Sequence, residues 1–307
     1  MINNKHWAAG NIPDQSGRIA IVTGANSGIG YETARVLAHQ GATTILACRN
    51  EQKGKAAVEK IQSEGAKGTA VFLPLDLADL DSIHAFANSF KAQYQRLDLL
   101  INNAGIMTPP FGQTKQGFET QFGVNHLGHF ALTGLLLDLI QRTPQSRIVT
   151  VSSIMHKGGK INFDDLNSAQ SYNRSAAYGQ SKLANLLFTY ELQRKLEAAG
   201  SDTIAVAAHP GWTDTNLQQH AGLIEFFNRF LAQKPEMGAL PTLRAAVDAN
   251  VQGADYYGPT RRFETVGYPE KVQSNGRSHD QQTAAKLWDI SEELTGVHYD
   301  FARQTEA

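Results

Sequence analysis

Apolar runs and amphipathic stretches alternate with a regular spacing along most of this 307-residue chain. The apolar runs are continuous, as expected for strands that are buried on both faces of a parallel sheet. The stretches between them have the apolar spacing and the length of helices. This alternation predicts an α/β fold with a doubly wound parallel sheet. The expected strands are Ile19–Gly24, Thr43–Cys48, Thr69–Leu77, Leu97–Ala104, Arg147–Ser153, Thr203–His209 and Asp255–Gly258, and the expected helices are Ile29–His39, Glu51–Glu64, Leu80–Tyr94, Gly117–Gln141, Ala176–Ala198 and Thr283–Leu294.

No repeat, low-complexity segment or linker rich in Gly, Ser or Pro divides the chain, so we expect a single domain over residues 1–307. Two insertions interrupt the alternation, one between Ser153 and Tyr178 and the other from Trp212 to about Pro241. The expected parts are a core over about residues 17–258, a helical substrate lid at about 212–241 and a C-terminal extension at about 259–307.

Composition excludes several classes of protein. Lys and Arg number 28 and Asp and Glu number 29, so the chain lacks the basic excess typical of nucleic-acid binding. The single cysteine, Cys48, excludes an intrachain disulfide and a cysteine-rich metal site. We read no signal peptide at the N-terminus, and no apolar run approaches the ~18 residues needed to span a bilayer. We therefore expect a cytoplasmic protein with no transmembrane segment and no nucleic-acid partner.

A glycine-rich segment follows the first apolar run and leads directly into a helix. Glycines permit a tight turn and let the backbone approach a pyrophosphate closely. The N–H groups and the dipole at the helix start then favour the anion. An ordinary strand-to-helix turn is the alternative, but the position after the first strand favours a Rossmann-type dinucleotide site. The cofactor-binding candidates here are Gly24, Asn26, Ser27, Gly28, Ile29 and Gly30.

The end of the second strand indicates which dinucleotide binds. NAD-selective sites usually place an acidic residue there to hold the ribose 2′-hydroxyl. Here the strand ends in Cys48 and Arg49, with no acid. The Arg49 guanidinium can pair with a 2′-phosphate, although a solvated surface arginine is the alternative. We expect NADP(H) to be preferred over NAD(H).

Tyr178 and Lys182 lie four residues apart on an expected helix and therefore share one face. A free tyrosine has a pKa of about 10. A nearby ammonium stabilises the phenolate, so we expect Lys182 to lower the pKa of Tyr178. Tyr178 could then exchange a proton with an alcohol or carbonyl oxygen as a general acid/base. Such a pair is common by chance, so it needs support from other motifs.

Several motifs occur together in a characteristic order. They are the glycine loop, Asn102-Asn103-Ala104-Gly105, Asn125, Ser152-Ser153, Tyr178-x-x-x-Lys182 and Pro210-Gly211. In this order and at these structural positions, the chain from roughly Gly17 to Gly258 resembles the short-chain dehydrogenase/reductases. The resemblance implies a nicotinamide-dependent oxidoreductase that interconverts a carbonyl and an alcohol.

Finer features resemble one branch of that family, which includes retinol dehydrogenases, WW-domain oxidoreductases and protochlorophyllide reductases. These features are Asn125–Phe130, Val151–His156 and His209-Pro210-Gly211. The step of 25 residues from Ser153 to Tyr178 (178 − 153) is also similar to this branch.

The resemblance implies roles for individual residues. Tyr178 would be the general acid/base, Lys182 would hold the nicotinamide ribose, Asn125 would position a relay water, and Ser153 would bind the substrate oxygen. Family spacing favours Ser153 over Ser152 for that task. The further cofactor contacts implied are Asp76 and Leu77 at the adenine, Asn103, Ala104 and Gly105 near the ribose, and Pro210, Gly211 and Thr213 near the nicotinamide, with Thr215 nearby.

The segment after Pro210-Gly211 is apolar at helical spacing. Phe226, Phe227 and Phe230 would give the lid an apolar inner wall, so we expect a hydrophobic carbonyl or alcohol substrate; ordinary packing and membrane-surface attachment are the alternatives. His126, His129, His156 and His209 have no cysteine or paired acidic spacing to support them as ligands, and we expect no metal site.

The alternative function is a catalytically silent NADP(H)-binding regulatory or scaffold protein. Such a protein usually lacks one of the four catalytic residues, and this chain has them all. The resemblance leaves a homodimer or a monomer open. The family commonly forms dimers or tetramers through two helices that include the one bearing Tyr178, and this branch also includes monomers.

Overall fold

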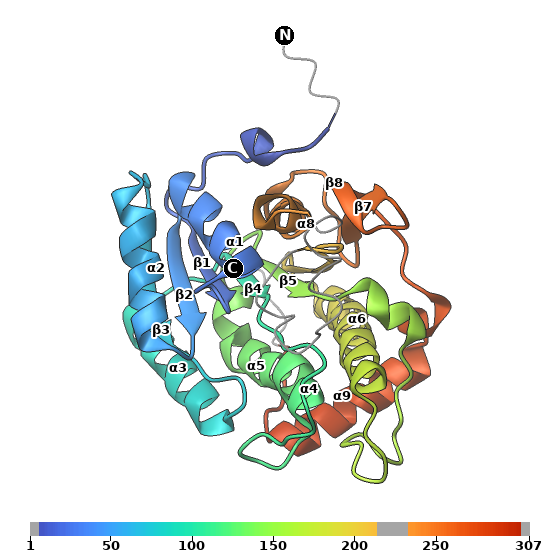
Figure 1. The fold of residues 1–307 in the computed structure, drawn as a ribbon. Coiled ribbons are helices and arrows are strands. Elements are labelled where there is room, and N and C mark those ends of the chain that lie inside the picture. Colours follow the sequence, from blue (N-terminus) through green and yellow to red (C-terminus); the bar gives the residue numbers. More distant parts are fainter. Residues whose placement is uncertain (1–5, 214–232, 302–307) are drawn as a thin grey trace.

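The computed structural model describes residues 6–213 and 233–301. An eight-stranded sheet has the order β3-β2-β1-β4-β5-β6-β7-β8, with β8 antiparallel to β7 and every other pairing parallel. The sheet confirms the expected α/β Rossmann-type class (Figure 1). The strands are β1 Ile19–Thr23, β2 Thr43–Cys48, β3 Thr69–Pro74, β4 Leu99–Asn102, β5 Arg147–Val151, β6 Ile204–Ala208, β7 Tyr256–Arg261 and β8 Val266–Lys271.

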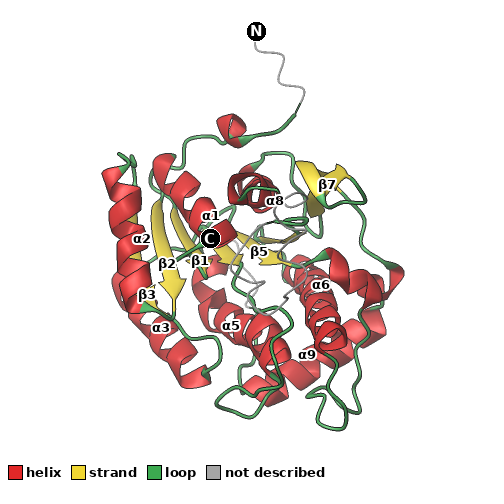
Figure 2. Ribbon diagram, viewed as in Figure 1, coloured by secondary structure: helices red, strands yellow, loops and turns green. Residues whose placement is uncertain are grey.

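Helices cover both faces of the sheet (Figure 2). The bounds are α1 Gly28–His39, α2 Glu51–Ser63, α3 Leu80–Gln93, α4 Thr120–Phe122, α5 Gly128–Gln141, α6 Arg174–Ala198, α8 Pro235–Val247 and α9 Gln281–Thr295. Successive side chains of a strand point to opposite faces, so Ala20 and Val22 of β1 pack with α1 and α8, whereas Ile21 packs with α3, α5 and α6. This burial on both faces explains why the strands are continuously apolar in the sequence.

Polar side chains fix where several helices begin. Asn50, Asp79, Asn173 and Asp280 each accept a backbone N–H in the first turn of α2, α3, α6 and α9 respectively. These residues satisfy donors that have no partner within the helix, which is the usual role of Asn and Asp at this position. The starts of α1, α2, α3, α6 and α9 therefore agree with the expected ones to within two residues, whereas α8 has no expected counterpart and the long helix after β4 begins later than expected.

The expected helix Gly117–Gln141 is divided in the structure. It begins at Thr120 rather than at Gly117, because Gly117 has a positive φ of 84° and Glu119 caps the first turn. After α4, residues Gly123–Leu127 form a single π-helical segment, η2, before α5 continues to Gln141. Such π-segments occur frequently at functional sites. Asn125 lies at the centre of this one.

In the C-terminal part, β7 begins within the expected strand Asp255–Gly258 but continues to Arg261, and β8 has no counterpart among the expected strands. Gly258-Pro259 and Gly267-Tyr268-Pro269 have the composition of turns, yet they lie within β7 and β8. Prolines are tolerated there because β6 pairs with β7 only at Tyr256 and Tyr257, and β8 is an edge strand. The connecting turn at residues 262–264 has three consecutive positive φ angles.

The expected lid segment lies mostly outside the described residues. Residues 235–241, which we included in it, belong to α8, and this helix packs on α1 and the sheet. That part of the expectation is wrong, because Leu240 and its apolar neighbours on α8 join the core. Phe226, Phe227, Phe230 and Thr215 lie outside the described residues.

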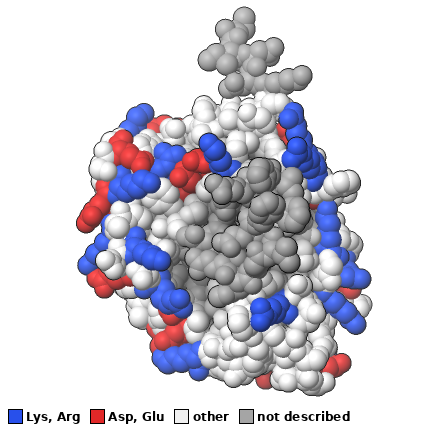
Figure 3. Space-filling model, in the orientation of Figure 1, with Lys and Arg blue, Asp and Glu red and all other residues white. Residues whose placement is uncertain are grey.

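The charged residues are mixed in sign. On the face in Figure 3, acidic and basic side chains are interspersed over the side of the molecule that carries α2 and α3, in keeping with the near-zero net charge. Within the described ranges, no helix is both long enough and apolar enough to cross a membrane.

Candidate active site

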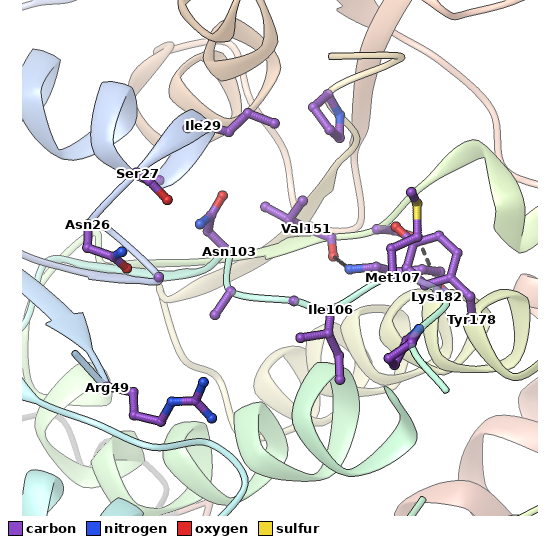
Figure 4. Close-up of a pocket in the computed structure, with 18 residues that line it drawn as sticks. Asn26, Ser27, Ile29, Arg49, Asn103, Ile106, Met107, Val151, Tyr178 and Lys182 are labelled. Atoms are coloured by element: carbon purple, nitrogen blue, oxygen red, sulfur yellow. Dashed lines mark hydrogen bonds between the residues drawn. The ribbon is translucent and has the colours of Figure 1, made fainter. Parts of the chain in front are cut away.

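A cavity of about 450 Å³ opens at the carboxyl ends of the parallel strands. The sheet order reverses between β1 and β4, and such switch points form a crevice where α/β proteins bind ligands. Figure 4 shows Asn26, Ser27 and Arg49 at one end of the cavity and Met107, Tyr178 and Lys182 at the other. The lining residues are Gly24, Asn26, Ser27, Gly28, Ile29, Gly30, Arg49, Asn103, Ala104, Gly105, Ile106, Met107, Pro109, Val151, Ser152, Tyr178, Lys182 and Pro210.

The glycine loop forms a close-packed cradle at the start of α1. Gly24 and Gly28 have φ angles of 68° and 57°, which side chains rarely adopt. A Cβ on Gly30 would lie 2.5 Å from Asn103 Nδ2 and 2.5 Å from the Gly24 carbonyl oxygen. The Ser27 side chain does not cap α1, so the first-turn N–H groups remain without a capping side chain. The loop therefore fits a pyrophosphate at a helix N-terminus.

Thr23, which the sequence analysis missed, joins this cradle to the loop after β4. Its Oγ1 accepts the backbone N–H groups of Asn103 and Ala104, both at 2.9 Å. Asn103 Nδ2 returns a hydrogen bond of 2.8 Å to the Thr23 carbonyl. These contacts link residues about 80 positions apart in the sequence, so no local pattern could reveal them.

Arg49 reaches into the cavity from the end of β2, and 77% of its side chain is exposed. Its nearest carboxylate is Asp76, at 3.9 Å, which is too long for a strong ion pair. Asp76 Oδ1 instead accepts the backbone N–H of Ala78. Asp76 and Leu77 do not line the cavity in this structure, although Asp76 lies beside Arg49. The guanidinium thus remains available to an anion.

Tyr178 and Lys182 both line the cavity from α6, with Lys182 Nζ 5.7 Å from the centre of the tyrosine ring. Burial raises the pKa of Tyr178 to about 12, and a side-chain hydrogen bond with Ser153 opposes that rise. The expected lowering by Lys182 is therefore wrong for this structure. Lys182 Nζ donates to the Val151 carbonyl at 3.1 Å, and burial lowers its own pKa to about 8.

The two adjacent serines have different surroundings. Ser152 Oγ donates to the Lys182 carbonyl at 2.7 Å, so its hydroxyl is used in holding β5 to α6. Ser153 interacts with the Tyr178 side chain and accepts the Met155 N–H at 3.2 Å. His156, another residue that the sequence analysis left without a role, contacts the Ser153 carbonyl through Nδ1 at 2.6 Å. The hydroxyl of Ser153, which family spacing favoured, is thus the one beside Tyr178.

The Asn125 side chain is held by the backbone of the cavity wall. Its Oδ1 accepts the Ile106 N–H at 2.8 Å, and its Nδ2 donates to the Ile106 carbonyl and to Ser181 Oγ, both at 3.0 Å. Gly105 lies between Asn125 and Lys182. A Cβ at Gly105 would be 3.2 Å from Asn125 Oδ1 and 3.4 Å from Lys182 Nζ.

The segment after β6 only partly enters the cavity. Pro210 lines it, whereas Gly211 and Thr213 do not. Thr213 Oγ1 donates to the Pro210 carbonyl at 3.0 Å and lies against Gly238 of α8. Beside this segment, the buried His209 ring packs over Gly258 of β7, where a Cβ would lie 1.9 Å from Nε2.

Residues at the Tyr178 end of the cavity were also missed. Ile106, Met107 and Pro109 line it and give it an apolar wall. Tyr172, in the insertion between Ser153 and Tyr178, donates its hydroxyl to the Pro109 carbonyl at 2.9 Å and so fixes the wall to that insertion. The length of this insertion was the only signal in the sequence.

Three of the four histidines considered for a metal contact other polar groups. His126 contacts Ser291, His129 contacts Thr23 and the Asn125 carbonyl, and His156 contacts Ser153 and Asn275. Among the residues that the structure describes, no group of three or more His, Cys, Asp or Glu side chains could hold a metal ion.

Comparison with known proteins agrees with this geometry. Residues 18–223 match the family model of the short chain dehydrogenases. Retinol dehydrogenase 14 of Mus musculus is 40% identical over 314 residues, covering 96% of this chain and 91% of that protein. Retinol dehydrogenase 12 of Homo sapiens is 40% identical over 290 residues, covering 92% and 88% respectively.

A solved structure is also similar over nearly the whole chain. The crystal structure of an uncharacterized protein from Mycobacterium Paratuberculosis has a TM-score of 0.82 and 44% sequence identity, and the match covers 96% of this chain and 99% of that one. The similarity extends beyond the dinucleotide-binding core to the C-terminal extension.

Proposed function

The chain belongs to the short-chain dehydrogenase family and is an oxidoreductase related to retinol dehydrogenases, and from that premise we propose that it transfers hydride between NADP(H) and a hydrophobic alcohol or carbonyl compound, with Tyr178 as general acid/base. The observation that carries the proposal is that one cavity joins the glycine cradle to Tyr178 and Lys182.

The residues of the cavity fit a dinucleotide. The cradle is crowded at Gly24 and Gly30, has a positive φ at Gly24 and Gly28, and presents a helix N-terminus, which suits a pyrophosphate. Arg49 lies where β2 ends and is highly exposed, and its one carboxylate neighbour, Asp76, is 3.9 Å away, so the guanidinium suits a 2′-phosphate. These features support NADP(H) over NAD(H). When bound, the nicotinamide supplies the hydride chemistry.

The side chains of this chain would then handle the proton. Burial raises the pKa of Tyr178 to about 12, so the phenol is protonated at neutral pH and can donate a proton to a carbonyl oxygen during reduction. Ser153 would hydrogen-bond the same oxygen and stabilise the charge that develops on it. Lys182 would hold the nicotinamide ribose, and Asn125 would hold a water that reconnects Tyr178 to solvent protons.

The substrate wall is apolar. Ile106, Met107 and Pro109 surround the Tyr178 end, and the related retinol dehydrogenases are named for a hydrophobic alcohol. Apolar walls bind such ligands by removing their surface from water, while a few polar groups fix the orientation. We therefore propose long-chain or retinoid-like aldehydes, ketones and alcohols as the substrate class.

Replacement of Tyr178 by Phe tests the mechanism. Tyr178→Phe removes the proton donor and should lower kcat by about 10²- to 10⁴-fold. Fluorescence titration should show that NADPH still binds. Tyr190→Phe is the matched control, since Tyr190 is buried on the same helix but bonds to Ser274 away from the cavity, and it should retain most activity. Substantial turnover by Tyr178→Phe would reject Tyr178 as the acid/base.

Replacement of Arg49 by Ala tests the cofactor. Charged hydrogen bonds contribute about 1.5–3 kcal/mol, so Arg49→Ala should weaken NADPH binding by roughly 10- to 100-fold. NADH lacks the 2′-phosphate, so its affinity should change little. Titration of both cofactors against wild type and variant gives the four dissociation constants needed. Equal losses for NADPH and NADH, or none, would contradict the role given to Arg49.

A further inference from the structure

A buried histidine, His129, connects the two ends of the candidate active site. It lies on α5, one turn after Asn125, and is almost completely buried. Its Nδ1 is 3.0 Å from the Asn125 carbonyl oxygen, and its Nε2 is 2.9 Å from Thr23 Oγ1. The ring thus spans from the π-helical segment that carries Asn125 to the end of β1, where the glycine cradle begins.

The partners determine which ring nitrogen carries the proton. A carbonyl oxygen can only accept, so Nδ1 must be the donor to Asn125. Burial and the nearby Lys182 lower the pKa of His129 to about 4, so the ring is neutral at physiological pH and Nε2 is an acceptor. The Thr23 hydroxyl must therefore donate to Nε2, and its lone pairs remain free for the N–H groups of Asn103 and Ala104.

The hydrogen bonds form one directed chain. The loop N–H groups of Asn103 and Ala104 donate to Thr23, Thr23 donates to His129, and His129 donates to the Asn125 carbonyl. Asn103 and Ala104 line the cofactor cavity, and the Asn125 amide binds Ile106 in the wall of the same cavity. Each donor in this chain has its acceptor, and a satisfied buried network favours one geometry.

We propose that His129 is a positioning residue. It fixes Asn125 on its π-helical segment and joins Asn125 to the loop of Asn103 and Ala104. The cofactor cradle and the proton relay thereby keep one relative geometry. This inference rests on the proposed function. His129 touches neither the cavity nor the reacting groups, so it acts only through Asn125 and Thr23.

Two substitutions separate positioning from simple packing. His129→Leu keeps the bulk and loses both polar contacts, whereas His129→Asn is smaller but places an amide donor where Nδ1 lies. Positioning predicts that His129→Leu lowers kcat by about 10- to 100-fold and that His129→Asn recovers part of the loss. The Kd for NADPH should change little, because Thr23 can donate instead to the Ile101 carbonyl at 3.3 Å.

The matched control is Thr133→Val, one turn further along α5. It removes the buried hydrogen bond from Asn102 Nδ2 to Thr133, and it should lower stability while leaving kcat near the wild-type value. Wild-type kcat in His129→Leu, or a kcat in His129→Asn no higher than in His129→Leu, would overturn the proposal.

A measurement without substrate keeps this test independent of the proposed function. In ¹⁵N-histidine NMR spectra of the whole protein, the signal that is lost in His129→Asn should show the neutral tautomer with the proton on Nδ1. The other tautomer, or a charged ring at neutral pH, would overturn the assignment of donor and acceptor. Failure of the wild type to turn over any carbonyl would instead reject the proposed function and leave the tautomer result standing.

Discussion

Gly105 shows how much the chemistry of one site depends on the absence of a side chain. A methyl group at this position would lie in contact with both Asn125 Oδ1 and Lys182 Nζ, and two groups expected to share a relay water need that space. The φ angle of Gly105 is not among the positive ones, so the backbone itself does not require glycine here.

Gly105→Ala should therefore lower kcat by about tenfold with a smaller effect on stability, because it separates the relay groups and leaves the core intact. Steady-state kinetics and thermal melts check this together. Gly158→Ala is the control, since a Cβ there would meet no atom within 4 Å. Equal kcat values for the two variants would show that the space at Gly105 has no catalytic use.

Single residues were predictable where a local pattern marked them. The glycine cradle, Arg49, Tyr178 and Lys182 share one cavity, as their spacing indicated. The direction of the Tyr178 pKa shift was not predictable, because it depends on burial by distant segments. Thr23 and His129 were missed as partners, since 106 positions separate them.

At the scale of elements, the C-terminal helix α9 extends the core across α5 and α6. Trp288 packs against Phe130 of α5 and Phe188 of α6 with ring-centre separations of 5.1 and 5.8 Å. Tyr299, just after α9, joins the same cluster and donates its hydroxyl to the Phe130 carbonyl. The C-terminal extension, through α9 and Tyr299, thus packs against α6, the helix that carries Tyr178.

Removing the packing of Trp288 in this aromatic cluster should destabilise the whole protein. Trp288→Ala leaves a cavity in the aromatic cluster and should lower the free energy of unfolding by about 3–5 kcal/mol. Denaturant unfolding measures the loss. Phe263→Ala, at a side chain that is 97% exposed, should change stability by less than about 0.5 kcal/mol. A similarly small effect of Trp288→Ala would mean that α9 is not part of the cooperative unit.

The parallel strands and their helices were predictable because burial on both faces produces long apolar runs. The π-helical segment η2 was not, because its sequence Gly123–Leu127 has ordinary helical spacing and only the hydrogen-bond pattern distinguishes it. Strand β8 was missed because its glycine and proline are typical of turns and are tolerated only at a sheet edge.

At the scale of the whole molecule, neutral histidines in the interior link stability to pH. Burial lowers the pKa of His126 to about 3, of His129 to about 4 and of His209 to about 3. The unfolded chain binds protons at these side chains near pH 6.5, whereas the folded protein does not. Their contribution to stability is therefore present above about pH 6.5 and is lost as the pH falls toward 3 to 4.

The melting temperature should accordingly change little between pH 8 and 7 and fall steeply below about pH 6.5. His126→Leu should flatten the fall, because it removes one such group from a site lined by Phe122, Phe130 and Phe188. Calorimetry of both proteins across this range gives the comparison. The same slope in wild type and variant would contradict the link to His126.

The close contact between His209 and Gly258 limits how this enzyme can evolve. Any side chain at position 258 would overlap the imidazole, so a substitution there is acceptable only after residue 209 has become smaller. A smaller residue at 209 alone would leave a void beside Tyr256, which contacts the His209 ring. Neither single change is neutral, and descendants of this chain must therefore alter the two positions together or keep both.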